Sequence, residues 1–186
     1  MLSVLEAANL LRSLDRVLIL THVRPDGDTV GCAAALCAGL RSLGKTAYLL
    51  PNPGLTDTTA PYFAPYAAPA EFVPDHVVST DIATVGLFPD NALPYADRVD
   101  LAIDHHPSFT HFGKANIVRP EAAACGELIY DLLAALGPIT AEMAPVSYTH
   151  LLRPQPPCQK GQGFLPQEGD VSGPIEQILP SPWVGA

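Results

Sequence analysis

Basic residues are scarce in this sequence of 186 residues: 10 lysines and arginines stand against 19 acidic residues, which gives a net charge of −9. Binding to long nucleic acid is driven by neutralising phosphates, so we do not expect so acidic a chain to coat it. A small anionic substrate held by metal ions is compatible with this charge. No uncharged apolar run approaches the ~18 residues of a membrane-spanning helix, so no membrane span is expected.

Cysteine pairs are also absent. The four cysteines, Cys32, Cys37, Cys125 and Cys158, form no CxxC motif. Two of them lie in apolar helical stretches, where a free cysteine acts as a small apolar side chain. We therefore expect a reducing, cytosolic setting. Polar residues interrupt the opening stretch MLSVLEAANLLRSLD, so the N-terminus is not expected to be a signal peptide.

Apolar residues make up 48% of the chain, enough for one domain of ordinary size with a real core. Helices are predicted from Ser3, over 29–43 and over 121–136, and short buried strands over 17–21, 46–50, 77–80 and 99–103. This alternation predicts an α/β fold with a mostly parallel sheet flanked by helices.

The sequence pattern changes near Pro145. Residues 145–186 are rich in proline and glycine and have no sustained helical or strand period. We expect this segment to be an irregular tail, and residues 1–144 to form the folded domain.

Acidic residues and histidines follow three of the predicted strands. They are His22, Asp26 and Asp28 after VLILT, Asp81 after VVST, and Asp104, His105 and His106 after VDLAI. The carboxyl ends of parallel strands share one edge of a sheet, so we expect these side chains to converge. Oxygen and imidazole ligands without thiolate suit Mn²⁺ or Mg²⁺, with Zn²⁺ and Fe²⁺ as alternatives. The carboxylates are too many for one ion, whereas two divalent ions about 3.5–4 Å apart, sharing one aspartate, would form a phosphoryl-transfer site.

Each of these signals has a simpler explanation when it stands alone. PDGD is commonly a turn, a single aspartate after a strand is commonly a helix cap, and a His-His pair is commonly a surface or core feature. Their joint occurrence at three strand ends favours the metal site.

The same residues carry a resemblance to a known family. THVRPDGDTVGCAAAL (21–36) resembles the first motif of the DHH phosphoesterases. Asp81 stands where their second motif places an aspartate, and DHHPS (104–108) matches the third motif, from which the family takes its name. ACGELIYDLL (124–133) resembles the helix that follows in the oligoribonuclease and phosphoadenosine-phosphatase branch. The likeness spans roughly residues 1–144.

The resemblance implies a metal ligand at each matching position. His22 and Asp26 would bind one Mn²⁺, Asp28 and His105 would bind a second, and Asp81 would bridge the two. The water between the ions, acidified by both, would be the nucleophile.

The resemblance also implies two catalytic roles outside the ligand set. Asp104 would hold and polarise a histidine, and His106 would contact the scissile phosphate or the attacking water. Arg24 varies in the family and receives no role.

The function implied by the resemblance is that of a manganese-dependent hydrolase. Its substrates would be very short RNA oligonucleotides, or the 3′-phosphate of 3′-phosphoadenosine 5′-phosphate. Alternatives on the same site are a cyclic-dinucleotide phosphodiesterase and a pyrophosphatase. An alternative of another class is a truncated, non-catalytic domain that binds metal or nucleotide, and a homodimer is left open.

Two features of the family are missing from the sequence. No strand with an Asp-Thr-Gly motif follows AEMA, where family members carry the aspartate that completes the second metal site, and the glycine-rich substrate domain is missing too. Asp170 has no strand before it and is not expected to replace that aspartate. Our hypothesis is that the reading departs from the native gene near Pro145 by frameshift, chimeric assembly or truncation, which would leave this chain weakly active or inactive. Resequencing that finds one uninterrupted native frame would contradict it.

Overall fold

The computed structural model of the protein describes residues 1–143, so the predicted tail over 145–186 lies outside the described residues. Its centre is a five-stranded sheet in which all strands run parallel. The strands are β1 (Val17–Leu20), β2 (Ala47–Leu49), β3 (His76–Thr80), β4 (Val99–Asp104) and β5 (Ala115–Val118). The predicted α/β fold with a parallel sheet is thereby confirmed.

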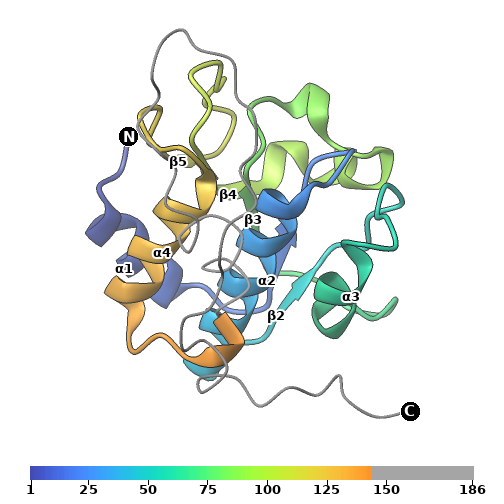
Figure 1. Cartoon of the computed structure of the whole chain (residues 1–186), viewed down its shortest axis with the longest axis horizontal. Helices are drawn as coiled ribbons and strands as arrows, with labels where there is room; N and C mark the ends of the chain where they lie inside the picture. The colour runs from blue at the N-terminus through green and yellow to red at the C-terminus, as the bar shows by residue number, and fades with distance from the viewer. Residues whose placement is uncertain (144–186) are drawn as a thin grey trace, which may run out of the picture. The chain divides into compact units, whose positions relative to one another are not determined.

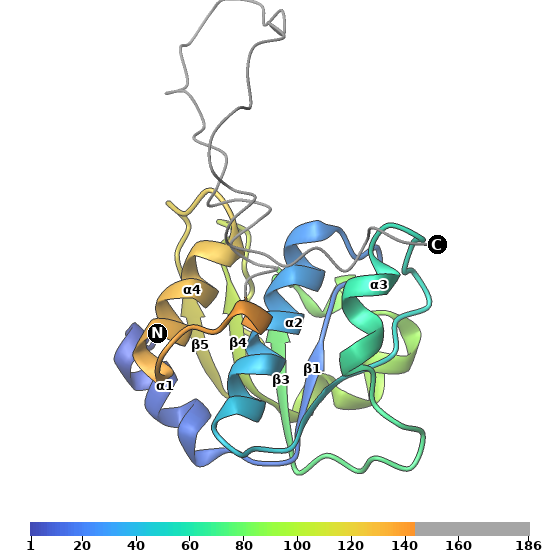
Figure 2. The same ribbon diagram turned by 60° about the horizontal axis from the view of Figure 1, so that its bottom comes forward.

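The three longer helices cover one face of the sheet, as Figures 1 and 2 show. They are α1 (Val4–Ser13), α2 (Gly27–Ser42) and α4 (Cys125–Leu136). Helix α1 begins where Ser3 and Glu6 form a capping box, as their spacing predicts. Helix α2 consists largely of small residues and is buried from Thr29 to Leu40, because it packs on the sheet and against helix α4, which lies beside it (Figure 2).

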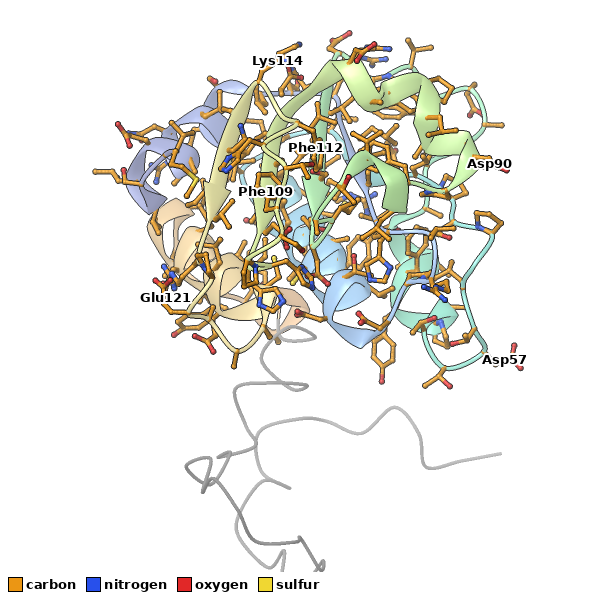
Figure 3. The ribbon with its side chains drawn as sticks, turned by 90° about the horizontal axis from the view of Figure 1, so that it is seen from above. Asp57, Asp90, Phe109, Phe112, Lys114 and Glu121 are labelled. Atoms are coloured by element: carbon orange, nitrogen blue, oxygen red, sulfur yellow. The ribbon has the colours of Figure 1, made fainter. Side chains whose placement is uncertain are left out.

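Shorter elements and aromatic side chains cover the second face. The 3₁₀ helices η2 (Val85–Leu87) and η3 (Asp90–Arg98) lie there, and Phe88 packs edge to face on Phe112. Figure 3 shows Phe109 and Phe112 together over this face, with their ring centroids 5.4 Å apart. The remaining short elements are α3 (Ala60–Phe63), η1 (Ala64–Tyr66) and η4 (Ala141–Met143).

The strand order, β2-β1-β3-β4-β5, determines where a ligand can enter. From β1 the sheet extends in both directions, to β2 on one side and to β3, β4 and β5 on the other. The connections after β1 and β3 therefore diverge, and a crevice opens outside their carboxyl ends. Side chains that follow these two strands lie at the mouth of that crevice.

Three sequence expectations need correction. Strand β5 and the two 3₁₀ helices on the second face were not predicted, and the helix expected over 121–136 begins only at Cys125. Strand β5 is short, and three of its four residues are only partly buried, so it lacks the apolar run that marks the other strands. Within residues 1–143, no helix is long and apolar enough to cross a membrane.

Candidate metal centre

Asp81 occupies the centre of the candidate site. It comes directly after β3, and its backbone adopts the left-handed conformation (φ 59°), which aspartate tolerates better than most residues. Its backbone N–H donates to the Ile103 carbonyl at 2.9 Å. The carboxylate is nearly buried, with 3% of the residue exposed. The Nε2 atom of His105 lies 3.6 Å from its Oδ1, and the Nε2 atom of His22 lies 4.0 Å from its Oδ2. Asp81 therefore faces histidines from two different strand ends.

Two groups of potential ligand atoms share Asp81. One group contains His22 and Asp26, the other contains His105 and His106, and within each group the ligand atoms lie within 4.8 Å of one another. Together they line a pocket of about 310 Å³. These five residues follow three different strands, β1, β3 and β4, and meet at the carboxyl edge of the sheet.

The electrostatics of the pocket fit a divalent cation. Burial, followed by repulsion from Asp28, Asp26 and Asp104, raises the pKa of Asp81 to about 8. Its Oδ1 atom is buried and accepts no hydrogen bond within the described part of the chain. A buried carboxylate oxygen without a donor, surrounded by other carboxylates, is unfavourable unless a positive charge binds beside it.

Asp26 combines a structural role with a place in the pocket. It is the N-cap of α2, where its Oδ1 atom accepts the backbone N–H groups of Asp28 at 3.0 Å and Thr29 at 3.1 Å. The same oxygen lies 3.8 Å from His22 Nε2. The imidazole, together with these N–H groups, lowers the pKa of Asp26 to about 2, so this carboxylate is charged at neutral pH.

Asp104 holds the two adjacent histidines in place. Its Oδ1 atom accepts the backbone N–H groups of His105 at 2.7 Å and His106 at 3.2 Å, and it lies 2.8 Å from the Nδ1 atom of His106. A carboxylate only accepts, so His106 Nδ1 carries the proton and Nε2 is left as its basic nitrogen. His105 is fixed in the same sense, because its Nδ1 atom lies 3.2 Å from the Ala122 carbonyl and its Nε2 faces Asp81.

Asp28 lines the pocket but belongs to neither ligand group. Its Oδ2 accepts the N–H of Cys125 at 2.8 Å, and its Oδ1 accepts the N–H of Gly126 at 3.1 Å. The N-cap residue of α4 is Ala124, which offers no capping side chain, so Asp28 caps this helix from α2. Its role as a metal ligand stays a prediction.

The residues that brace His22 were missed by reasoning from the sequence. Asn52 is buried, and its Nδ2 donates to the His22 carbonyl at 2.8 Å and to Thr21 Oγ1 at 2.9 Å. The PNPG motif around it has the ordinary composition of a turn, so no local signal distinguishes this role. Gly54 lies against the backbone of the loop that carries His22, since a Cβ at position 54 would come within 2.3 Å of the Val23 carbonyl oxygen.

Comparisons with known proteins identify relatives of this chain and structures that share its fold. A relative, the bifunctional oligoribonuclease and PAP phosphatase NrnA of Thermus thermophilus, is 33% identical over 138 residues, or 73% of this chain and 42% of NrnA. Two solved structures share the fold: an exopolyphosphatase-related protein from Bacteroides fragilis (TM-score 0.61, 23% identity, covering 78% of this chain and 48% of that one) and exonuclease RecJ bound to manganese (TM-score 0.50, 18% identity, covering 79% and 42%). The chain thus spans less than half the length of each of these relatives. The family model for the DHH family, N-terminal domain, matches residues 16–152, and the chain belongs to that family.

Proposed function

We propose that this chain is the catalytic domain of a metal-dependent phosphoesterase acting on short RNA oligonucleotides or on 3′-phosphoadenosine 5′-phosphate. The observation that carries the proposal is the buried Asp81 carboxylate, which two groups of ligand atoms share and whose Oδ1 atom has no hydrogen-bond donor among the described residues. The name of the NrnA relative, an oligoribonuclease and PAP phosphatase, supports the substrate class. The manganese bound to RecJ, which shares the fold, supports the choice of Mn²⁺.

The chain would hold two Mn²⁺ ions through its own side chains. His22 and Asp26 would bind one ion, His105 and Asp28 the other, and Asp81 would bind both. When bound, such ions polarise a phosphoryl oxygen and lower the pKa of water, which supplies a nucleophile at neutral pH.

The other residues position the substrate. Because Asp104 holds the Nδ1–H of His106, the Nε2 of His106 is the basic nitrogen, which can accept a proton from water and, once protonated, donate to a phosphate oxygen. Asp104 itself is fully buried and acts through His106. The braced histidines lose little freedom when substrate binds, and this preorganisation favours catalysis.

A non-catalytic domain that binds metal or nucleotide is the second candidate. The observation favouring it is that both oxygens of Asp28 already accept N–H groups from α4, which leaves the second metal position with fewer ligands. The cyclic-dinucleotide phosphodiesterase and the pyrophosphatase remain alternatives on the same site.

The compartment and the oligomeric state are separate parts of the proposal. A cytosolic setting agrees with the free, buried cysteines Cys32, Cys37 and Cys125. Sedimentation of the full chain would test for a homodimer.

The test is to titrate the full 186-residue chain with Mn²⁺ and to measure its turnover. Two tightly bound ions, with hydrolysis of a dinucleotide or of 3′-phosphoadenosine 5′-phosphate, would support the proposal. Hydrolysis of cyclic diadenylate or pyrophosphate instead would favour the alternatives, and fewer than two ions without turnover would favour the non-catalytic domain. Asp81→Ala should abolish turnover, whereas Asp57→Ala, on an exposed loop (Figure 3), serves as the matched control.

A further inference from the structure

Arg24 differs from the other arginines of residues 1–143. Each of the others has a polar partner: Arg12 binds the carbonyls of Ala135 and Leu136, and Arg16, Arg41, Arg98 and Arg119 likewise bind carbonyls or a carboxylate. Arg24 is exposed and has no hydrogen bond, ion pair or ring contact within that part of the chain. It is also the only lysine or arginine among the described residues that lines the pocket.

The backbone that carries Arg24 is held on both sides. The N–H of Val23 donates to the Leu87 carbonyl at 2.7 Å, and Asn52 donates to the carbonyl of His22 at 2.8 Å. The following residue, Pro25, is buried and packs against Gly54, where a Cβ would come within 3.0 Å of its ring. The guanidinium therefore extends from a fixed loop, and only side-chain freedom is lost when it binds a ligand.

The charges around Arg24 indicate an anionic ligand. Asp26, Asp28 and Asp81 line the same pocket as Arg24. Within residues 1–143, no carboxylate oxygen of these aspartates lies within the 4.0 Å of an ion pair with the Arg24 guanidinium. In the proposed function, metal ions held by those carboxylates would neutralise them, and the ions would hold the scissile phosphate at the same place. The positive charge of Arg24 is then left for a second anion at the pocket wall.

We infer that Arg24 binds a second, non-scissile phosphate, so that the pocket selects nucleotides carrying two phosphoryl groups. This inference rests on the proposed function and names its substrate class more closely. A planar guanidinium donates two parallel N–H bonds to the oxygens of a terminal phosphate, which an ammonium cannot do. Arg24 is thereby a specificity residue rather than part of the metal centre.

The experiment compares adenosine 3′,5′-bisphosphate with adenosine 3′-monophosphate on the full chain with Mn²⁺. The readout is the ratio of the two kcat/KM values for the wild type, Arg24→Gln and Arg24→Lys. Arg24→Gln should reduce the preference for the bisphosphate roughly 10- to 100-fold, the range for a charged hydrogen bond. Arg24→Lys should recover part of it, because it restores the charge without the fork. Lys45→Gln, which removes a cation outside the pocket lining, is the control and should keep the wild-type ratio.

An unchanged ratio in Arg24→Gln would overturn the inference while leaving the phosphoesterase proposal intact. If the wild type hydrolyses neither compound, the phosphatase activity on 3′-phosphoadenosine 5′-phosphate fails while the oligonucleotide activity is tested separately with a dinucleotide, and the binding of both compounds is then compared by calorimetry. A wild-type preference for the bisphosphate that Arg24→Gln loses would still support the role of Arg24. Equal binding of the two compounds by the wild type, or a preference retained in Arg24→Gln, would refute it.

Discussion

Replacing Asp81 with asparagine should stabilise the metal-free protein while destroying its metal centre. The carboxylate is buried, and its pKa is raised from 3.8 to about 8, so the folded protein holds a proton that the unfolded chain releases. The folded state therefore binds more protons than the unfolded state between these two pH values. The free energy of unfolding must fall as the pH rises through that window.

The expected magnitude follows from the width of the window. One pKa unit corresponds to about 1.36 kcal/mol, so raising the pH from 5 to 8 should lower the stability of the metal-free wild type by about 4 kcal/mol through Asp81 alone. Asp26 adds nothing to this slope, because its pKa is lowered to about 2 and it stays charged in both states above pH 5. Since domains are typically stable by only about 5–15 kcal/mol, the effect should be readily measurable.

The assay is urea unfolding of the full chain in EDTA at pH 5 and pH 8, for the wild type, Asp81→Asn and Asp57→Asn. The exposed Asp57 is the control, and its variant should follow the wild type at both pH values. Asp81→Asn cannot ionise and should lose about 4 kcal/mol less than the wild type between the two pH values. An identical pH dependence of the wild type and Asp81→Asn would refute the view that Asp81 is a buried charge awaiting a cation.

Adding Mn²⁺ completes the comparison. A ligand that binds only the folded state stabilises it by about 2.7 kcal/mol at a concentration 100 times its Kd. The wild type should gain stability at pH 8, whereas Asp81→Asn should gain none. A gain in Asp81→Asn equal to that of the wild type would show that the ions bind elsewhere.

Four further predictions test neighbouring parts of the molecule. Asp28→Ala should destabilise the protein by about 1–2 kcal/mol even in EDTA, because α4 loses its cap; no change would mean that Asp28 matters only for metal. His106→Ala should lower kcat roughly 100-fold and Mn²⁺ content much less, whereas equal losses would reassign it as a ligand. Gly54→Ala should displace the Val23 carbonyl and weaken Mn²⁺ binding roughly tenfold in calorimetry, and unchanged affinity would separate this loop from the site. Gly113→Ala should lower the stability by about 1–3 kcal/mol without changing Mn²⁺ affinity, since its Cβ would meet the Ala115 carbonyl oxygen at 2.7 Å; an unaltered urea midpoint would contradict the packing.

The strands with continuous apolar runs were predictable because burial on both faces requires such a run. β1, β3 and β4 lie within a residue or two of their predicted bounds, and α1 begins at the capping box read from Ser3 and Glu6. The start of α4 was not predictable, because its cap is a carboxylate 97 residues earlier in the chain. A helix boundary set by such a distant partner leaves no local signature.

The metal centre likewise has features that the sequence predicts and features that only the fold explains. Its residue types and their positions after strand ends are local, so the sequence by itself determined that His22, Asp26, Asp81 and His105 are candidates. The family resemblance already implies that Asp81 bridges two ions, but the physical reason is tertiary: β3 lies between β1 and β4 in the sheet, which places Asp81 between the residues that follow those two strands. The bracing by Asn52 and the unpaired charge of Arg24 within residues 1–143 were likewise decided by the fold, since both depend on loops that meet only when the strands assemble.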